Sequence, residues 1–286
     1  MRGGPIAYMA EVTIGLALFS ALLYGCADFF GGLASRRTRA TTVVVVSQLA
    51  GVVVLAIAWR FVPGRFEASD VWYGIAGGVG GGLAIAALYA ALAVGRMGIV
   101  SPIAAVIGAT VPVIWGFAAG ERPAATATIG VACAFVAVGL VSTDGRSRFT
   151  LREPGLALAL LSGLGIGVLY VALAAGHRDP GLGRLAVVRA TSLVVLASYA
   201  LLRRESLRPA RGSVRLILFA GTLDMGANVL YVAALRNGAL AIVAVLTSLY
   251  PASTVFLARV VLGERLVPVQ WAGVAFAALG VALIAR

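Results

Sequence analysis

Long apolar runs separated by short loops constrain this chain more than any other feature of its sequence. Ten runs have about the length that a helix needs to cross a bilayer. Only 12% of the residues are charged and 61% are hydrophobic, whereas a soluble globular domain carries about 25% charged residues. Such a chain cannot cover a surface that faces water, so the sequence predicts an all-α integral membrane protein with ten transmembrane helices. The predicted spans are residues 12–34, 41–61, 72–94, 98–117, 124–142, 155–175, 184–202, 213–235, 239–261 and 268–285.

Part of the chain repeats itself. Residues 90–140 align without a gap onto residues 233–283, and the shared positions include a Gly-Glu-Arg triplet at 120–122 and at 263–265. Composition does not easily explain that match, because the whole chain contains only 11 acidic residues. A weaker match relates the first span to the sixth. The chain is therefore predicted to contain a duplicated unit, in which the Glu of each triplet has a structural role.

The duplication predicts two domains of five helices each, residues 1–142 and 155–286, joined by a polar linker at 143–154. Because five is an odd number, the second domain would cross the membrane in the opposite sense to the first. Such an inverted repeat is typical of secondary transporters, whose binding site lies between the two halves near the middle of the bilayer.

All 23 basic residues are Arg, and the net charge is +12. A charge of this size usually indicates an acidic partner. Here, however, most Arg residues lie in predicted loops, where they orient helices and meet anionic lipid, so nucleic acid is not expected as a partner. Loops after the odd-numbered spans carry more Arg than the opposite side, to which Arg122, Arg178 and Arg184 are assigned. The positive-inside rule then places the first group of loops in the cytoplasm and both termini outside.

Ionisable residues inside a span cost about 2.5–3.5 kcal/mol each on insertion scales and usually face an interior. Asp28, Arg189 and Asp224 are of this kind. Asp224 shares one helix face with Asn228 and Tyr231, which favours either a polar strip along a substrate path or a hydrogen-bond network between helices. Their depths predict an ion pair between Arg189 and Asp224, with Asp28 separate. The alternative for Arg189 is a side chain that extends to the membrane interface.

A carboxylate inside a membrane can carry protons, so Asp28 or Asp224 is a candidate for proton coupling, unless neighbouring hydroxyl groups cap it. Tyrosines within the spans can stack on a substrate or simply pack against other helices. Neither cysteine has a metal-ligand spacing, and no metal or cofactor is expected. The predicted substrate-cavity residues are Tyr24, Asp28, Gln48, Tyr89, Tyr170, Arg189, Asp224, Asn228, Tyr231 and Tyr250.

The chain resembles the EamA-type members of the drug/metabolite transporter superfamily. It shares with them ten spans, a five-plus-five repeat and a Gly-Glu-Arg after the fourth span of each half. The most specific stretch runs from Ser248-Leu249-Tyr250-Pro251 to the second Gly-Glu-Arg, whereas the first half has Gly108 where Pro251 stands. The resemblance implies export of small metabolites across a bacterial inner membrane. The chain also resembles bacterial amino-acid exporters, including aromatic amino-acid exporters of the YddG type.

The predicted function is secondary active export of small metabolites by alternating access, with amino acids, including aromatic or hydrophobic ones, as the first substrate class. Efflux of cationic drugs, or carriage of another metabolite such as a nucleotide sugar, stays open. The two Asp residues favour a cation, whereas Arg189 favours a carboxylate. A channel would need a polar stripe repeated along several helices. An enzyme would need paired catalytic groups, and the only histidine, His177, has none beside it in the sequence. The expected partners are the substrate, the lipid bilayer and protons, and the protein is expected to be a monomer or a weak dimer.

Overall fold

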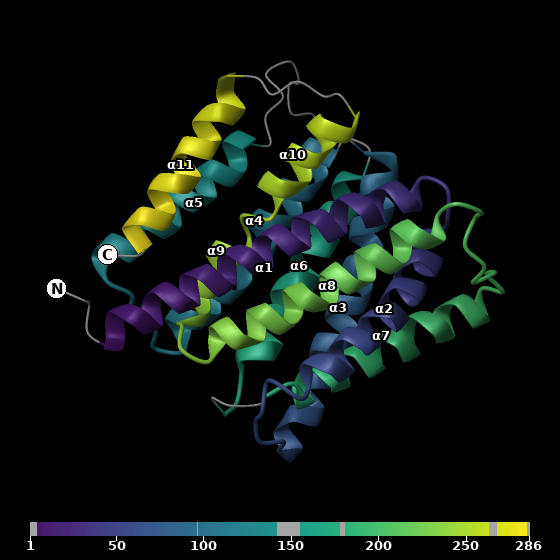
Figure 1. Ribbon diagram of the computed structural model, residues 1–286, viewed down its shortest axis with the longest axis horizontal. Helices are drawn as coiled ribbons and strands as arrows, with labels where there is room; N and C mark the ends of the chain where they lie inside the picture. The colour runs from purple at the N-terminus through teal and green to yellow at the C-terminus, as the bar shows by residue number, and fades with distance from the viewer. Residues whose placement is uncertain (1–4, 96, 142–154, 178–180, 263–267, 285–286) are drawn as a thin grey trace.

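The computed structural model describes residues 5–95, 97–141, 155–177, 181–262 and 268–284, which form helices joined by short loops and no strand (Figure 1). The predicted all-helical fold is confirmed for this part of the chain, and the predicted linker at 143–154 lies outside it. The helices are α1 (Pro5–Ser35), α2 (Ala40–Ala58), α3 (Ala68–Val94), α4 (Met97–Ala118), α5 (Ala125–Val141), α6 (Leu156–Ala174), α7 (Gly183–Leu202), α8 (Val214–Leu235), α9 (Leu240–Thr247), α10 (Pro251–Leu262) and α11 (Pro268–Ile284).

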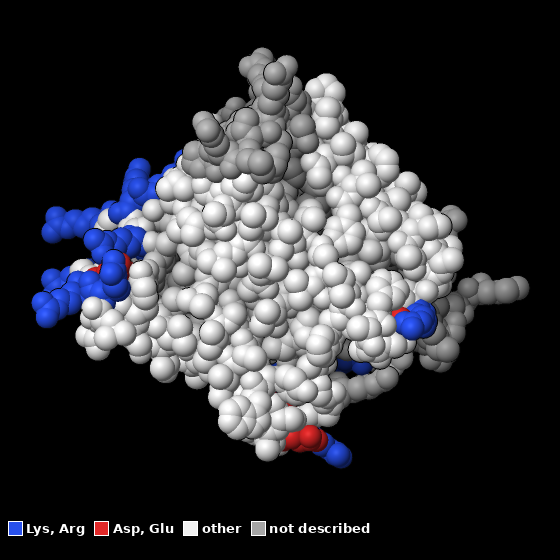
Figure 2. Space-filling model, turned by 180° about the vertical axis from the view of Figure 1, so that it is seen from behind, with Lys and Arg blue, Asp and Glu red and all other residues white. Residues whose placement is uncertain are grey.

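Eight helical stretches of the described residues are long and apolar enough to cross a bilayer, counting α9 and α10 together as one. The helices α5 and α11 have 17 residues each and are shorter. Large apolar side chains point outward from the helices, and Val53 and Val194 are 62% and 65% exposed. Charged side chains on the face in Figure 2 gather toward its edges, and a broad uncharged band lies between them. Lipid tolerates such a band and water does not, which supports a multi-pass membrane protein.

The ninth predicted span, residues 239–261, is not one continuous helix. α9 ends at Thr247 and α10 begins at Pro251. Proline lacks an N–H and disfavours helical geometry in the residue before it, so the chain leaves the helix after Thr247 and resumes it at Pro251. By contrast, α4 continues through Pro102 and Pro112. The interruption places Tyr250 beside the cavity described below.

Two groups of three helices form the body of the molecule. In the first group, α1 and α2 both pack along α8; in the second, α6 and α7 both pack along α3. The helix α4 lies against α6, while α9 and α10 lie against α1, and α5 pairs with α11 at one side of the molecule (Figure 1). Each group therefore combines helices from both predicted domains.

Glycines allow the close approach of helices within each group. A Cβ on Gly221 of α8 would overlap the backbone of Ser47 on α2, and a Cβ on Gly78 of α3 would lie 2.5 Å from the Cβ of Thr191 on α7. Gly78 and Gly221 are as far apart in the sequence as residues 90 and 233 of the aligned repeat (221 − 78 = 233 − 90). Small residues let helix backbones pack closely in a membrane, and both groups use them at equivalent positions.

The Gly-Glu-Arg triplet of the first half joins two helices. Glu121 accepts hydrogen bonds from the backbone N–H groups of Leu240 and Ala241, at 2.8 and 3.0 Å, and so caps the start of α9. Arg122 donates to the carbonyl oxygen of Phe117, at 2.9 Å, near the end of α4. A carboxylate at a helix N-terminus satisfies free N–H groups and complements the helix dipole, which agrees with the structural role predicted for this Glu. The second triplet, at 263–265, lies outside the described residues.

Candidate functional site

A narrow cavity of about 60 Å³ lies between the two groups of helices. Helices α1, α2 and α8 form one wall, and α3, α6 and α7 form the other, with Tyr250 contributed by the interruption between α9 and α10. The volume is enough for a few water molecules. Eight of the ten predicted cavity residues line it: Tyr24, Asp28, Gln48, Tyr170, Arg189, Asp224, Asn228 and Tyr250.

The other two predicted residues do not line the cavity. The hydroxyl of Tyr89 lies 3.4 Å from the carbonyl oxygen of Ala27, which places this buried side chain between α3 and α1. Tyr231 is fully buried, and its ring stacks on that of Tyr170 with the centroids 4.4 Å apart. Helical spacing correctly placed Tyr231 on the same side of α8 as Asn228, but Tyr170 covers it.

An ion pair crosses the cavity from one wall to the other. Nη2 of Arg189 on α7 lies 2.8 Å from Oδ2 of Asp224 on α8, and the two side chains are 8% and 16% exposed. The pair predicted from the depths of these residues is therefore present, and the alternative of an Arg189 side chain directed to the membrane surface is wrong. Asn228 donates to the backbone carbonyl of Asp224 at 2.8 Å, which adds a local contact on α8. Nε of Arg189 has no hydrogen-bond partner among the described residues.

A second hydrogen bond also joins the two walls. Nε2 of Gln48 on α2 donates to Oγ of Ser192 on α7 at 2.7 Å. Oε1 of Gln48 has no partner in the described part of the chain. The cavity therefore contains a free acceptor on Gln48 and a free donor on Arg189. Groups of this kind are usually satisfied by a ligand or by water when they are buried.

Asp28 lies in the same cavity but apart from the ion pair. It is 3% exposed, and across the described residues no hydrogen bond or ion pair reaches its carboxylate. The alternative of a carboxylate capped by hydroxyl groups is therefore not observed there. Aromatic rings line the same cavity, where the ring of Tyr24 is 6.4 Å from the rings of both Tyr170 and Tyr250. The site thus combines an unpaired acid, a paired guanidinium and an aromatic surface.

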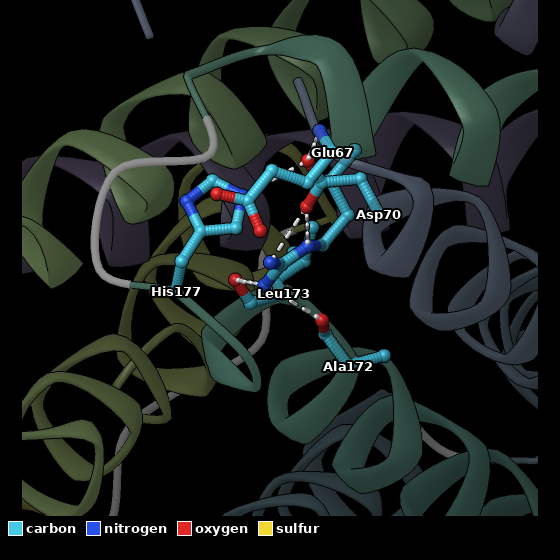
Figure 3. A network of polar contacts seen from close by, with 6 residues as sticks. Glu67, Asp70, Ala172, Leu173 and His177 are labelled. Carbon is cyan, nitrogen blue, oxygen red and sulfur yellow. Dashed lines mark hydrogen bonds and ion pairs between the residues drawn. The ribbon is translucent and has the colours of Figure 1, made fainter. Parts of the chain in front are cut away.

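Sequence reasoning missed a second charged cluster, at the end of the α3–α6–α7 group (Figure 3). Arg184 was assigned to a loop, but it lies in the first turn of α7 and is 1% exposed. Its Nε and Nη2 lie 2.8 and 2.7 Å from Oδ1 of Asp70, which is fully buried. Nη1 donates to the carbonyl oxygens of Leu173 and Ala172, at 2.9 and 3.3 Å, near the end of α6. Arg184 therefore links the start of α3, the end of α6 and the start of α7.

Two further contacts complete the environment of the Asp70 carboxylate. Oδ2 accepts a hydrogen bond from the backbone N–H of Glu67 at 2.7 Å, as part of a capping box at the start of α3. Nε2 of His177, in the loop after α6, lies 3.0 Å from the same oxygen (Figure 3). The cluster lies within one helix group and does not cross the cavity. Residues near span ends resemble interfacial residues in a sequence, so only the tertiary contacts identify Asp70 and Arg184 as partners.

Over the ranges that the structure describes, no group of three or more His, Cys, Asp or Glu side chains is arranged to hold a metal ion.

Comparisons with known proteins point to a transporter. Among solved structures, one titled "Crystal structure of protein" aligns with a TM-score of 0.69 at 16% sequence identity, covering 96% of this chain and 97% of that chain. At this identity the similarity shows a common fold alone. No curated protein matches the chain. Residues 153–286 match the EamA-like transporter family. This match, which covers the second half of the chain, supports a relation to the drug/metabolite transporter superfamily and a membrane transporter of small molecules.

Proposed function

We propose that this protein is a secondary active transporter that exports small metabolites from the cytoplasm, with amino acids as the first substrate class, and that the central cavity is its binding site. The observation that carries this proposal is the presence of both signs of charge in one cavity. Arg189 offers a guanidinium, and Asp28 offers an unpaired carboxylate, on opposite walls. A free amino acid carries a carboxylate and an ammonium group, which these two side chains complement.

The uncommitted polar atoms favour an amino acid over the other substrate classes. Nε of Arg189 can donate to a carboxylate, while Asp28 and the rings of Tyr24 and Tyr170 can hold an ammonium group. The aromatic rings suit an apolar or aromatic side chain. A cationic drug would use Asp28 and the rings alone. It would leave the guanidinium without a new partner, so cation efflux is the second candidate.

We further propose that residues 1–142 and 155–286 are inverted repeats. Ser20 contacts Ala227, and Thr13 lies beside Gly238, so α1 and α8 run antiparallel. In the same way α3 and α6 run antiparallel, while α3 runs parallel to α7 and α2 runs parallel to α8. Exchange of α1 with α6, α2 with α7 and α3 with α8 therefore reproduces the same set of packed pairs. Glu121 supports the inversion of the fourth spans, because it joins the end of α4 to the start of α9.

An inverted repeat supports alternating access, in which the two helix groups separate first at one end and then at the other. The Arg189–Asp224 ion pair and the Gln48–Ser192 hydrogen bond join the groups, so they are the contacts that such a motion would alter. Asp28 or Asp224 would bind a proton and release it as the cavity opens to the two sides of the membrane in turn. This carboxylate would thereby couple export of the substrate to proton entry. The proposed setting is a bacterial inner membrane with both termini periplasmic, and the proposed state is a monomer or weak dimer without enzymatic activity.

Uptake into proteoliposomes tests this proposal. Purified protein would be reconstituted and offered radiolabelled amino acids, quaternary amines and nucleotide sugars, each with and without a pH gradient. Accumulation of amino acids above that of empty liposomes is expected, with a larger signal when the gradient favours antiport. Movement of quaternary amines alone would favour cation efflux. If none of the compounds moves under either condition, the transporter proposal fails.

A further inference from the structure

A second hollow lies next to the central cavity. It has a volume of about 550 Å³ and lies where α6 and α8 end and α9 begins. We call it the vestibule; its polar lining comes from Glu121, His177, Arg236 and Asn237. A polar space of this size holds water. It therefore offers an aqueous approach to the middle of the molecule from the side where these three helix ends meet.

One helical turn separates the vestibule from the cavity. On α6, Tyr170 lines the cavity and Leu173 lines the vestibule; on α8, Asn228 lines the cavity and Val232 lines the vestibule. Three or four residues along a helix correspond to roughly 5 Å. The stacked rings of Tyr170 and Tyr231 occupy this turn, with centroids 4.4 Å apart and an angle of 18° between the planes. Both rings are shielded from solvent, at 2% and 0% exposure.

The two rings come from opposite walls of the cavity. Tyr170 is on α6, in the α3–α6–α7 group, and Tyr231 is on α8, in the α1–α2–α8 group. Separation of the groups at this end therefore has to part the rings. The hydroxyl of Tyr231 has no hydrogen-bond partner among the described residues. An unpaired buried hydroxyl regains a partner when water reaches it, which favours opening and makes the closed stack reversible.

Among the described residues, the positions that the repeat makes equivalent to the stack do not form a second ring pair. The alignment of residues 90–140 with 233–283, extended by two residues, places Leu88 opposite Tyr231, and the weaker alignment of the first and sixth spans places Asp28 opposite Tyr170. Asp28 and Leu88 both line the cavity. The repeat therefore does not supply the aromatic closure twice.

We propose that the Tyr170–Tyr231 stack is the gate between the central cavity and the vestibule, and that the vestibule is the route by which a small polar or amphipathic substrate passes on that side of the membrane. The role of the gate in substrate passage rests on the proposed transport function. Its geometry, however, can be tested without a substrate. Opening the stack connects two spaces that one turn of helix otherwise keeps apart.

Cysteine labelling tests the gate. In a background with Cys26→Ala and Cys133→Ala, two reporters would be introduced separately: Leu173→Cys in the vestibule and Val188→Cys in the cavity. A membrane-impermeant thiol reagent would be applied to intact cells and to inverted vesicles, and the side from which Leu173→Cys reacts defines the vestibule side. From that side, Tyr231→Ala and Tyr170→Ala are expected to raise the labelling rate of the cavity reporter at least about tenfold, because the open population rises in proportion.

Two controls keep the result specific to the stack. Tyr231→Phe keeps the ring and removes only the unpartnered hydroxyl, so labelling should stay as slow as in the parent. Tyr250→Ala removes a buried ring of equal size from the cavity but not from the turn between the two spaces, and it should not speed labelling from the vestibule side. An unchanged rate in both Tyr170→Ala and Tyr231→Ala would overturn the gate. So would equal acceleration in Tyr250→Ala. Failure of transport alone would not affect this result, so the two proposals can fail separately.

Discussion

Arg189 and Asp224 dominate the energetics of the site at the scale of single residues. Bringing a guanidinium and a carboxylate out of water costs several kcal/mol per ion, and their attraction offsets that cost only in good geometry. The 2.8 Å contact between them provides such geometry. The pair therefore adds little net stability, but the loss of either partner leaves a buried charge uncompensated. A contact of this kind suits a site in which a charged substrate group can replace one partner.

Removal of one partner should be more harmful than removal of both. We expect Arg189→Met to lower stability by about 3–5 kcal/mol, because Asp224 is left unpaired, and the double variant Arg189→Met/Asp224→Leu to recover much of the loss. Thermal unfolding in detergent would compare Arg189→Met, Asp224→Leu and the double variant with the parent protein as one double-mutant cycle. A double variant whose loss equals the sum of the two single losses would show that the ion pair does not couple these residues.

Asp28 should behave in the opposite way. Its carboxylate accepts no hydrogen bond from the described residues, so Asp28→Asn removes a charge without breaking a contact. We expect the melting temperature to stay the same or rise, while transport loses its response to a pH gradient. Parallel melting and flux measurements would check both parts. A stable variant with unchanged pH response would remove Asp28 from the coupling mechanism.

Single residues also show where the sequence stops being informative. The depth of Arg189 and Asp224 within their spans was enough to predict the ion pair, because charged groups in lipid need partners. Asp70 and Arg184 lie near span ends, where a charge can also reach water, so depth gave no reason to pair them. Tyr231 shares a helix face with Asn228, but its exclusion from the cavity depends on the position of Tyr170 on another helix.

At the scale of helices, caps and close contacts fix the ends and spacing of the elements. Glu121 is the clearest case, because both of its carboxylate oxygens bind N–H groups at the start of α9. The first N–H groups of a helix have no hydrogen-bond partner within the helix. Leaving them unpaired costs more free energy where water cannot reach them. The Gly-Glu-Arg triplet was recognisable as a repeated motif in the sequence. Its partner, a helix start more than one hundred residues away, was not, because the contact is tertiary.

We therefore expect Glu121→Ala to lower stability by about 1–2 kcal/mol through loss of the cap. Glu11→Ala, which removes an exposed carboxylate from α1, is the matched control and should cost less than about 0.5 kcal/mol. Thermal unfolding of both variants against the parent protein provides the comparison. Similar losses in the two variants would mean that Glu121 does not act through the start of α9.

The close packing of α2 against α8 leads to a second prediction for the helices. A Cβ at position 221 would overlap the backbone of Ser47, so Gly221→Ala should push the helices apart and destabilise the protein by more than about 1 kcal/mol. No atom lies within 4 Å of a Cβ built on Gly15, so Gly15→Ala should instead stabilise α1 by about 0.5–1 kcal/mol. Melting curves with opposite shifts would agree with this packing. A tolerated Gly221→Ala would contradict the close contact.

At the scale of the whole molecule, the packed groups differ from the domains expected from the sequence. The alignment of the two halves predicted a boundary near the middle of the chain, yet α3 packs with α6 and α7, and α8 packs with α1 and α2. Composition and span length were sufficient for an all-helical membrane protein. The exchange of helices between halves was not predictable, because apolar helix faces in lipid carry little information about their neighbours.

The buried cluster of Asp70, Arg184 and His177 stabilises one of these groups. Arg184 binds Asp70 on α3 and carbonyl oxygens at the end of α6, and its guanidinium also lies 5.3 Å from the ring centre of Tyr73. These contacts hold α3, α6 and α7 together at one end. Among the described residues, the Arg189–Asp224 ion pair and the Gln48–Ser192 hydrogen bond join α7 to α8 and α2 across the cavity.

In the proposed function, a zwitterionic substrate crosses the membrane through the cavity that contains Arg189 and Asp28. Counterflow in proteoliposomes tests it most directly. Liposomes loaded with an unlabelled amino acid would exchange it for the labelled form through the parent protein, through Arg189→Gln/Asp224→Asn, and through Gly15→Ala as the control outside the cavity. We expect rapid exchange in the parent and control. In the double variant with its fold intact, we expect a rate at least about tenfold slower, which corresponds to about 1.4 kcal/mol. Exchange at the parental rate in the folded double variant would contradict it.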